Sequence, residues 1–135
     1  MNNCPDILVI KSDKGELKRT ENFLQNFFRK NNLPEDYFNR VLLCVSEAVM
    51  NSIQHGNEND KNKKVSIHAD CKNGLINIKI TDEGDGFDFC NIENPTKQKN
   101  LKKESGRGIH IIQSLCNELE FREKGKCIQF KIECK

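Results

Sequence analysis

The pattern of apolar and polar positions predicts a strand followed by two helices in the first half of the chain. Residues 5–10 end in a short apolar run that is typical of a strand, and apolar positions at helical spacing predict an amphipathic helix over roughly 16–31. Pro34 suits the first turn of a second helix, which we expect to end near His55 with Gly56 as a left-handed cap.

The second half of the chain alternates differently and predicts two hairpins separated by a loop and a helix. Residues 65–69 and 75–80 alternate apolar with polar positions around Asn73-Gly74, the dipeptide that favours a type I′ turn. Periodicity is absent from 81 to about 105, a helix is expected from near Gly106, and strands are expected over 118–123 and 127–133. The order β-α-α-β-β-loop-α-β-β predicts an α+β sandwich with helices on a single face of one sheet.

Length and charge narrow the class of protein. A chain of 135 residues suits one domain, residues 1–135. Its formal net charge of +2 argues against nucleic acid as the direct partner, since phosphate binding usually leaves a clear basic excess. No stretch reaches the ~18 apolar residues of a membrane span, and the first residues do not resemble a signal peptide. We therefore expect a cytoplasmic protein that does not bind membranes.

The seven cysteines do not suggest a metal site or a disulfide framework. An odd number without a secretion signal argues against disulfides, and no C-x-x-C pair or suitable histidine spacing indicates zinc. We expect most of them to be small buried hydrophobes.

The first group of residues with chemical potential lies on the second predicted helix. Glu47, Asn51 and His55 are spaced i, i+4, i+8, so a regular helix would place them along one side. Two hard oxygen donors one turn apart suit Mg²⁺ or its waters, and Glu47 could orient or deprotonate an attacking hydroxyl. The same spacing is also found on ordinary solvated helix faces.

The second group, Asp82-Glu83-Gly84-Asp85-Gly86, directly follows an alternating strand. An Asp at a strand end is well placed to accept a hydrogen bond from a ligand's amino group, while Gly84 and Gly86 allow close approach of the backbone. A plain acidic turn or a calcium loop is the alternative, although the EF-hand pattern is not matched.

The third group, Gly106-Arg107-Gly108, opens the third predicted helix. Free N–H groups at a helix start, with glycines that permit close approach, suit a phosphate. Neither a Walker-type loop nor G-x-G-x-x-G occurs, which excludes P-loop and Rossmann sites. In their order, the three groups supply what a nucleotide site requires.

Together, these three groups of residues resemble the motifs of the GHKL (Bergerat-fold) ATPases. Residues 46–56 (S-E-A-V-M-N-S-I-Q-H-G) are similar to their N box, residues 82–87 (D-E-G-D-G-F) to their first glycine box, and residues 106–109 (G-R-G-I) to their second. Over roughly residues 5–133 the chain is most similar to the stand-alone anti-sigma factor serine-protein kinases. The resemblance implies a two-layer α/β sandwich with a mixed sheet.

The resemblance also implies roles for the residues of the N box. Asn51 would coordinate Mg²⁺ that bridges the phosphates of ATP, and Glu47 would be the general base for phosphoryl transfer. His55 would belong to the nucleotide-contacting residues.

The two glycine boxes would complete the ATP site. Asp82 would accept the adenine amino group, Gly84 and Gly86 would shape the pocket floor, and residues 88–105 would form a lid. The residues in contact with the phosphates would be Gly106, Arg107 and Gly108. Such a sparse set fits phosphoryl transfer, which relies on positioning and charge neutralisation.

The implied function is an ATP-dependent kinase that phosphorylates a serine of an anti-sigma antagonist and sequesters a sigma factor, with a homodimer as the family's habit. The chain departs from the family at Lys126-Cys127, where the family has a Thr after the matching Gly125 to support the adenine-binding Asp. That departure favours an alternative, a catalytically silent, ATP-dependent protein-binding module. A sensor histidine kinase is disfavoured because no helical hairpin with a phospho-accepting His fits the short N-terminal region.

Overall fold

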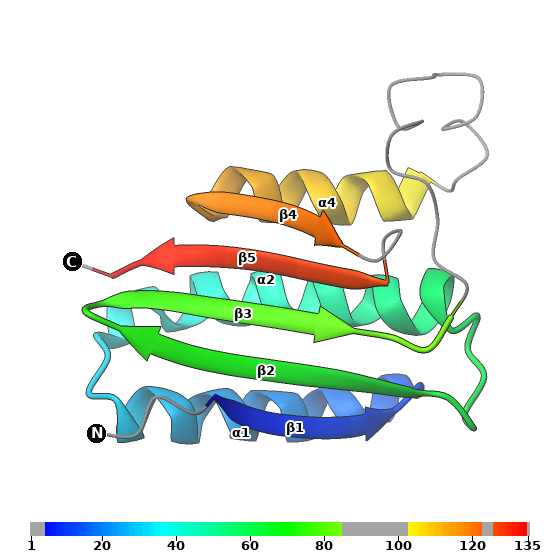
Figure 1. Ribbon diagram of the computed structural model, residues 1–135, viewed down its shortest axis with the longest axis horizontal. Coiled ribbons are helices and arrows are strands. Elements are labelled where there is room, and N and C mark those ends of the chain that lie inside the picture. Colours follow the sequence, from blue (N-terminus) through cyan, green and yellow to red (C-terminus); the bar gives the residue numbers. More distant parts are fainter. Residues whose placement is uncertain (1–4, 85–102, 123–125, 135) are drawn as a thin grey trace.

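The computed structural model describes residues 5–84, 103–122 and 126–134, and it contains the predicted order of strands and helices (Figure 1). Short 3₁₀ segments precede the first two helices, and a π-helical turn, η3, follows the second. The elements are β1 (Asp6–Lys11), η1 (Lys14–Glu16), α1 (Leu17–Lys30), η2 (Glu35–Tyr37), α2 (Phe38–Asn51), η3 (Ser52–Gly56), β2 (Lys64–Lys72), β3 (Leu75–Thr81), α4 (Lys103–Leu115), β4 (Glu118–Arg122) and β5 (Cys127–Glu133).

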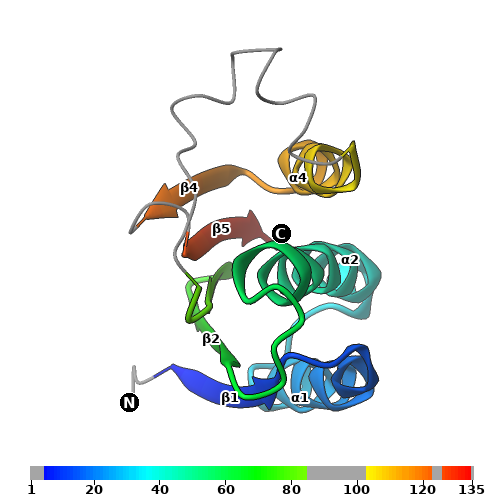
Figure 2. The same ribbon diagram turned by 90° about the vertical axis from the view of Figure 1, so that its right-hand side faces the viewer.

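The five described strands form one sheet in the order β1-β2-β3-β5-β4, and α1, α2 and α4 lie together on one of its faces (Figure 2). The α+β two-layer sandwich is therefore confirmed, but the expectation of a mixed sheet is wrong, because every neighbouring pair is antiparallel. The physical reason is the position of β5. The connection through α4 makes β3 and β4 run in the same direction, but β5 lies between them and pairs with both.

The core lies between the sheet and the helices. Alternate residues of β2 and β3 are completely buried, as the predicted period of two requires, and they include Val65, Ile67, Ile78 and Ile80. The apolar side of α2 packs onto them. The Asn73-Gly74 turn is also confirmed, with φ of 53° and 81°, the left-handed values that a type I′ turn needs.

The second helix differs from its prediction at both ends. Pro34 is extended (ψ 130°) and precedes η2, so it lies outside the first turn of α2. Gly56 is not a left-handed cap, since among the described glycines only Gly74 has a positive φ. The side of Gly56 where another residue would carry its Cβ atom instead faces the Asp82 carboxylate.

The described cysteines are free, and Cys44, Cys127 and Cys134 are buried as expected. Burial raises the pKa of the Cys44 thiol to about 12. Within residues 5–84, 103–122 and 126–134, no group of three His, Cys, Asp or Glu side chains could hold a metal ion. The helices of this described part are all too short or too polar to cross a membrane.

Candidate functional site

The C-terminal end of α2 carries the two residues predicted to act on the phosphates. Glu47 is half-buried and Asn51 is only 6% exposed. The Asn51 Nδ2 atom is buried and has no hydrogen-bond partner among the described residues. A buried amide in this state is costly unless a partner arrives, so Asn51 is suited to meet a ligand.

Helix α4 packs directly against these two side chains through Gly108. A Cβ atom built on Gly108 would lie 2.8 Å from Glu47 Oε1 and 3.7 Å from Asn51 Nδ2. Any larger residue would therefore displace the Glu47 carboxylate. The third predicted group is thus brought to the first, at the position of Gly108.

The start of α4 differs from its prediction. The helix begins at Lys103, three residues before Gly106, because Lys103 and Glu104 are better helix formers than glycine and extend it. In a helix that begins at Lys103, the N–H groups without a partner within the helix extend only to Ser105, because the N-cap carbonyl accepts the N–H four residues later. The free N–H groups of this helix start therefore precede Gly106, Arg107 and Gly108.

His55 lies in η3, and the π-helical turn changes its relation to Glu47 and Asn51. The backbone N–H of Asn57 donates to the Ser52 carbonyl at 2.7 Å, the i to i+5 pattern of a π-helix. The step from Asn51 to His55 therefore runs through a π-helical turn, whereas Glu47 and Asn51 are one α-helical turn apart on α2.

Asp82 follows β3 and points into the protein beside η3. It is 6% exposed, its Oδ1 accepts the Gly84 N–H at 2.8 Å, and its own N–H donates to the Lys126 carbonyl at 2.9 Å. Burial raises the pKa of this carboxyl, while the Gly84 hydrogen bond and the charge of Lys126 act in the opposite direction. Asp82 is therefore a buried acceptor whose ionised form is costly to maintain.

Two glycines make room for this carboxylate and its turn. A Cβ atom on Gly56 would overlap the Asp82 carboxylate, and one on Gly84 would overlap the Gly56 carbonyl oxygen. Gly84 was expected to allow close approach of a ligand. In the structure, the group that approaches it closely is the Gly56 carbonyl of η3. Gly86 and residues 88–102 of the predicted lid (88–105) lie outside the described residues, while residues 103–105 form the start of α4.

The chain has Lys126 and Cys127 where the family has a Thr after the glycine. Cys127 is 1% exposed, and Lys126 supports Asp82 through its carbonyl. Ser52 of η3 is buried beside Asp82 and lowers the pKa of its carboxyl, although its Oγ makes no regular hydrogen bond within the described residues. Asp82 is therefore supported by the Lys126 carbonyl and by its neighbour Ser52, in place of the Thr hydroxyl that the family has.

Sequence reasoning missed the contributions of Gly56, Asn57 and Ser12. Asn57 is 1% exposed and Ser12 is 2% exposed, and their side chains are hydrogen-bonded to each other. No periodic pattern marks them, because their burial results from contacts between segments far apart in the chain. The only available signal was the polar Asn57 directly after the predicted helix end.

Comparison with known proteins agrees with this arrangement. Residues 10–132 match the histidine kinase-like ATPase domain family. The chain is 42% identical to an anti-sigma F factor of Shouchella clausii over 83 residues, which cover 59% of this chain and 56% of that protein. It is 30% identical to the serine-protein kinase RsbW of Bacillus subtilis over 90 residues, covering 62% and 56% of the two chains. The chain thus spans less than two thirds of the length of these relatives.

A longer match supports the same family, and a solved structure shows the same fold. An anti-sigma F factor of Clostridium botulinum (strain Eklund 17B / Type B) is 33% identical over 102 residues, which cover 71% of each chain. The crystal structure of the RsbU and RsbW domains of Rv1364c from Mycobacterium tuberculosis has the same fold, with a TM-score of 0.62 at 12% identity, over 97% of this chain and 32% of that one. The chain therefore belongs to the histidine kinase-like ATPase domain family, among relatives that are anti-sigma F factors and serine-protein kinases.

Proposed function

We propose that this protein is an ATP-dependent serine-protein kinase that acts as an anti-sigma factor in the cytoplasm. It transfers phosphate from ATP to a serine of an anti-sigma antagonist and sequesters a sigma factor. The observation that carries the proposal is the convergence at one end of α2, where Gly108 lies against Glu47 and Asn51 while Asp82 lies against η3. The names of the relatives supply the protein partners.

The adenine end of the site is assigned to Asp82. Its carboxylate is a buried acceptor held by the Gly84 N–H, and Lys126 and Lys63 add positive charge nearby. An acceptor in a desolvated position discriminates strongly between ligands with and without a matching amino group, because an unmatched buried polar group is costly. Gly84, together with Gly86, shapes the floor of this pocket in the proposal.

The phosphate end is assigned to Asn51 and α4. The partnerless Nδ2 of Asn51, next to Glu47 and to the Gly108 segment of α4, fits a triphosphate with its Mg²⁺. Asn51 would hold the ion through its amide oxygen, and the bound ion would neutralise phosphate charge. Gly106, Arg107 and His55 are the further nucleotide-contacting residues of the proposal.

Glu47 is assigned the proton transfer. The serine hydroxyl oxygen attacks the γ-phosphorus, the bond between that phosphorus and the β,γ-bridging oxygen breaks, and ADP leaves. Glu47 accepts the proton released from the serine hydroxyl. A positioned carboxylate in this role contributes typically about 10²- to 10⁴-fold to the rate.

The direct test is phosphorylation of a cognate anti-sigma antagonist with Mg-ATP. We expect one phosphoserine from the wild-type protein and a loss of at least about 100-fold in rate with Glu47→Ala, because this substitution removes the proposed proton acceptor. Glu21→Ala is the matched control, since Glu21 lies on α1 in a surface ion pair with Lys18.

Absence of phosphoserine with a verified antagonist would overturn the kinase assignment and favour the silent binding module. The proposal extends to a homodimer, which sedimentation of the purified chain would detect.

A further inference from the structure

Asn57 has a buried side chain whose hydrogen-bonding capacity is almost fully used. Its Nδ2 donates to Ser12 Oγ at 2.8 Å and to the Lys64 carbonyl at 3.0 Å, and its Oδ1 accepts the Glu83 N–H at 2.8 Å. These partners belong to three separate segments of the chain. The amide therefore joins the end of η3 to the β1–α1 connection, the start of β2 and the residue after Asp82.

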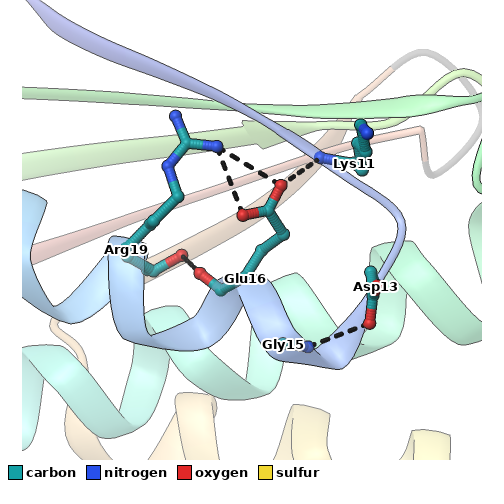
Figure 3. Close-up of polar contacts among 6 residues, drawn as sticks. Lys11, Asp13, Gly15, Glu16 and Arg19 are labelled. Carbon is teal, nitrogen blue, oxygen red and sulfur yellow. Dashed lines mark hydrogen bonds and ion pairs between the residues drawn. The ribbon is translucent and has the colours of Figure 1, made fainter.

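The β1–α1 connection holds Ser12 in a fixed position. The Glu16 carboxylate accepts the Lys11 N–H at 3.2 Å and pairs with Arg19, while Asp13 accepts the Gly15 N–H at 3.0 Å (Figure 3). Ser12 lies between these two contacts, and its hydroxyl donates to the Lys63 carbonyl at 2.8 Å. Asn57 thus meets a partner that its own neighbours already restrain.

The turn at Asp82 is held from both sides by these contacts. The Glu83 carboxylate accepts the Lys64 N–H at 2.6 Å, while the Glu83 N–H is bound by Asn57. Since the peptide unit between Asp82 and Glu83 is planar, fixing the Glu83 N–H also fixes the carbonyl end of Asp82. The backbone of Asn57 is also held, because its N–H donates to the Ser52 carbonyl and its carbonyl accepts the Asp60 N–H. The residue before it, Gly56, is the one against which the Asp82 carboxylate packs.

We infer that Asn57 is a positioning residue for nucleotide selectivity: it holds the Asp82-Glu83 peptide so that the Asp82 carboxylate, whose Oδ1 is held by the Gly84 N–H, presents its Oδ2 to the adenine amino group. This inference rests on the proposed role of Asp82. It goes beyond that role by assigning selectivity to a residue that does not touch the nucleotide. A hydrogen bond at a buried acceptor is lost steeply when its direction changes, so a small rotation of this peptide is sufficient.

The test compares the affinities of ATP and of purine riboside 5′-triphosphate, which lacks the adenine amino group and carries no new donor. In the wild-type protein we expect ATP to bind about 10- to 100-fold more tightly than the analogue. In Asn57→Ala we expect that preference to fall to about threefold or less, mainly through weaker ATP binding.

A matched control separates positioning from lost stability. Ile76→Ala creates a cavity at a completely buried site about 20 Å along β3 from Asp82. Assayed at a temperature where each variant is folded, it should keep the wild-type preference. A merely structural role for Asn57 predicts that Asn57→Ala behaves like this control, and that result would overturn the inference.

The failure of the proposed function gives a different result. A wild-type protein that binds both triphosphates equally would remove Asp82 as the adenine acceptor, and the Asn57 inference with it. Amide hydrogen exchange of the wild-type protein provides a second measurement that does not depend on a variant folding. The Glu83 N–H should exchange at least about tenfold more slowly than an unprotected amide, and an unprotected rate would also overturn the inference.

Discussion

At the scale of single residues, the site depends on positions where a side chain is absent. Gly56 and Gly84 allow η3 and the Asp82 turn to touch, and Gly108 allows α4 to touch Glu47. None of these three glycines has a positive φ, so their backbones would accept other residues. Space, and not backbone conformation, is what requires glycine there.

Gly56→Ala should therefore disrupt the site, whereas Gly15→Ala should be tolerated. The added methyl group at Gly56 overlaps the Asp82 carboxylate, while at Gly15 the nearest atom, Asp13 Oδ1, lies at an ordinary 3.6 Å. We expect Gly56→Ala to lower the free energy of unfolding by about 1–3 kcal/mol and Gly15→Ala to raise it by about 0.4–1 kcal/mol. Urea denaturation of both variants measures the difference, and equal effects would contradict the close packing of Gly56 on Asp82.

The sequence predicted which residues the fold brings together better than it predicted why. Gly108 lies against Glu47 and Asn51, and Asp82 lies against Gly56 in the turn that follows α2. The prediction of why glycine occurs at position 56 was wrong, because a glycine after a helix normally indicates a left-handed cap and Gly56 has no positive φ. Its true neighbour, Asp82, is distant in sequence and visible only in the fold.

At the scale of elements, the contact between α2 and α4 lies at Glu47, the residue proposed to act in phosphoryl transfer rather than in ATP binding. Gly108 touches the Glu47 carboxylate, which is the far end of a flexible side chain, so a methyl group there can move Glu47 without unfolding the helix. The position of the Glu47 carboxylate, the proposed general base, should be more sensitive to this contact than the stability of the fold is.

Gly108→Ala should lower the rate of phosphoryl transfer without lowering stability. Alanine favours a helix over glycine by about 1 kcal/mol, which offsets the displacement of Glu47. The rate should fall by up to about 100-fold while ATP affinity changes little, because the affected group acts on the serine proton. Ser114→Ala, on the exposed side of α4, is the control and should keep its rate. A Gly108→Ala variant with an unchanged rate would contradict the assignment of Glu47.

The regular elements were predictable because their periodicity reflects burial on one face. The π-helical turn was not, since a single i to i+5 bond, from the Asn57 N–H to the Ser52 carbonyl, leaves no periodic signal in the sequence. The start of α4 at Lys103 was missed for another reason, because the two glycines are a more conspicuous boundary than the ordinary helix formers before them.

At the scale of the whole molecule, the charge of Asp82 affects both the stability of the fold and the proposed binding of ATP. Burial raises the pKa of Asp82 in the folded protein above the unfolded value of about 3.8. Its contribution to the stability of the fold is therefore fully present below about pH 3.8, and it is lost as the pH rises through the folded pKa. At neutral pH the buried charge therefore lowers the stability of the nucleotide-free protein. ATP binding should also weaken as the pH falls toward the folded pKa, because protonation reduces the acceptor strength of Asp82.

The most direct test of the account is the thermal midpoint of the wild-type protein and Asp82→Asn, each with and without Mg-ATP. Without nucleotide, Asp82→Asn should melt at a higher temperature at neutral pH, since Asn keeps an acceptor for the Gly84 N–H and removes the buried charge. Mg-ATP at about 100 times its Kd should raise the wild-type midpoint by roughly 10 °C. The same concentration should shift Asp82→Asn far less. No shift of the wild type at millimolar Mg-ATP, or an equal shift of both proteins, would contradict the ATP site described here.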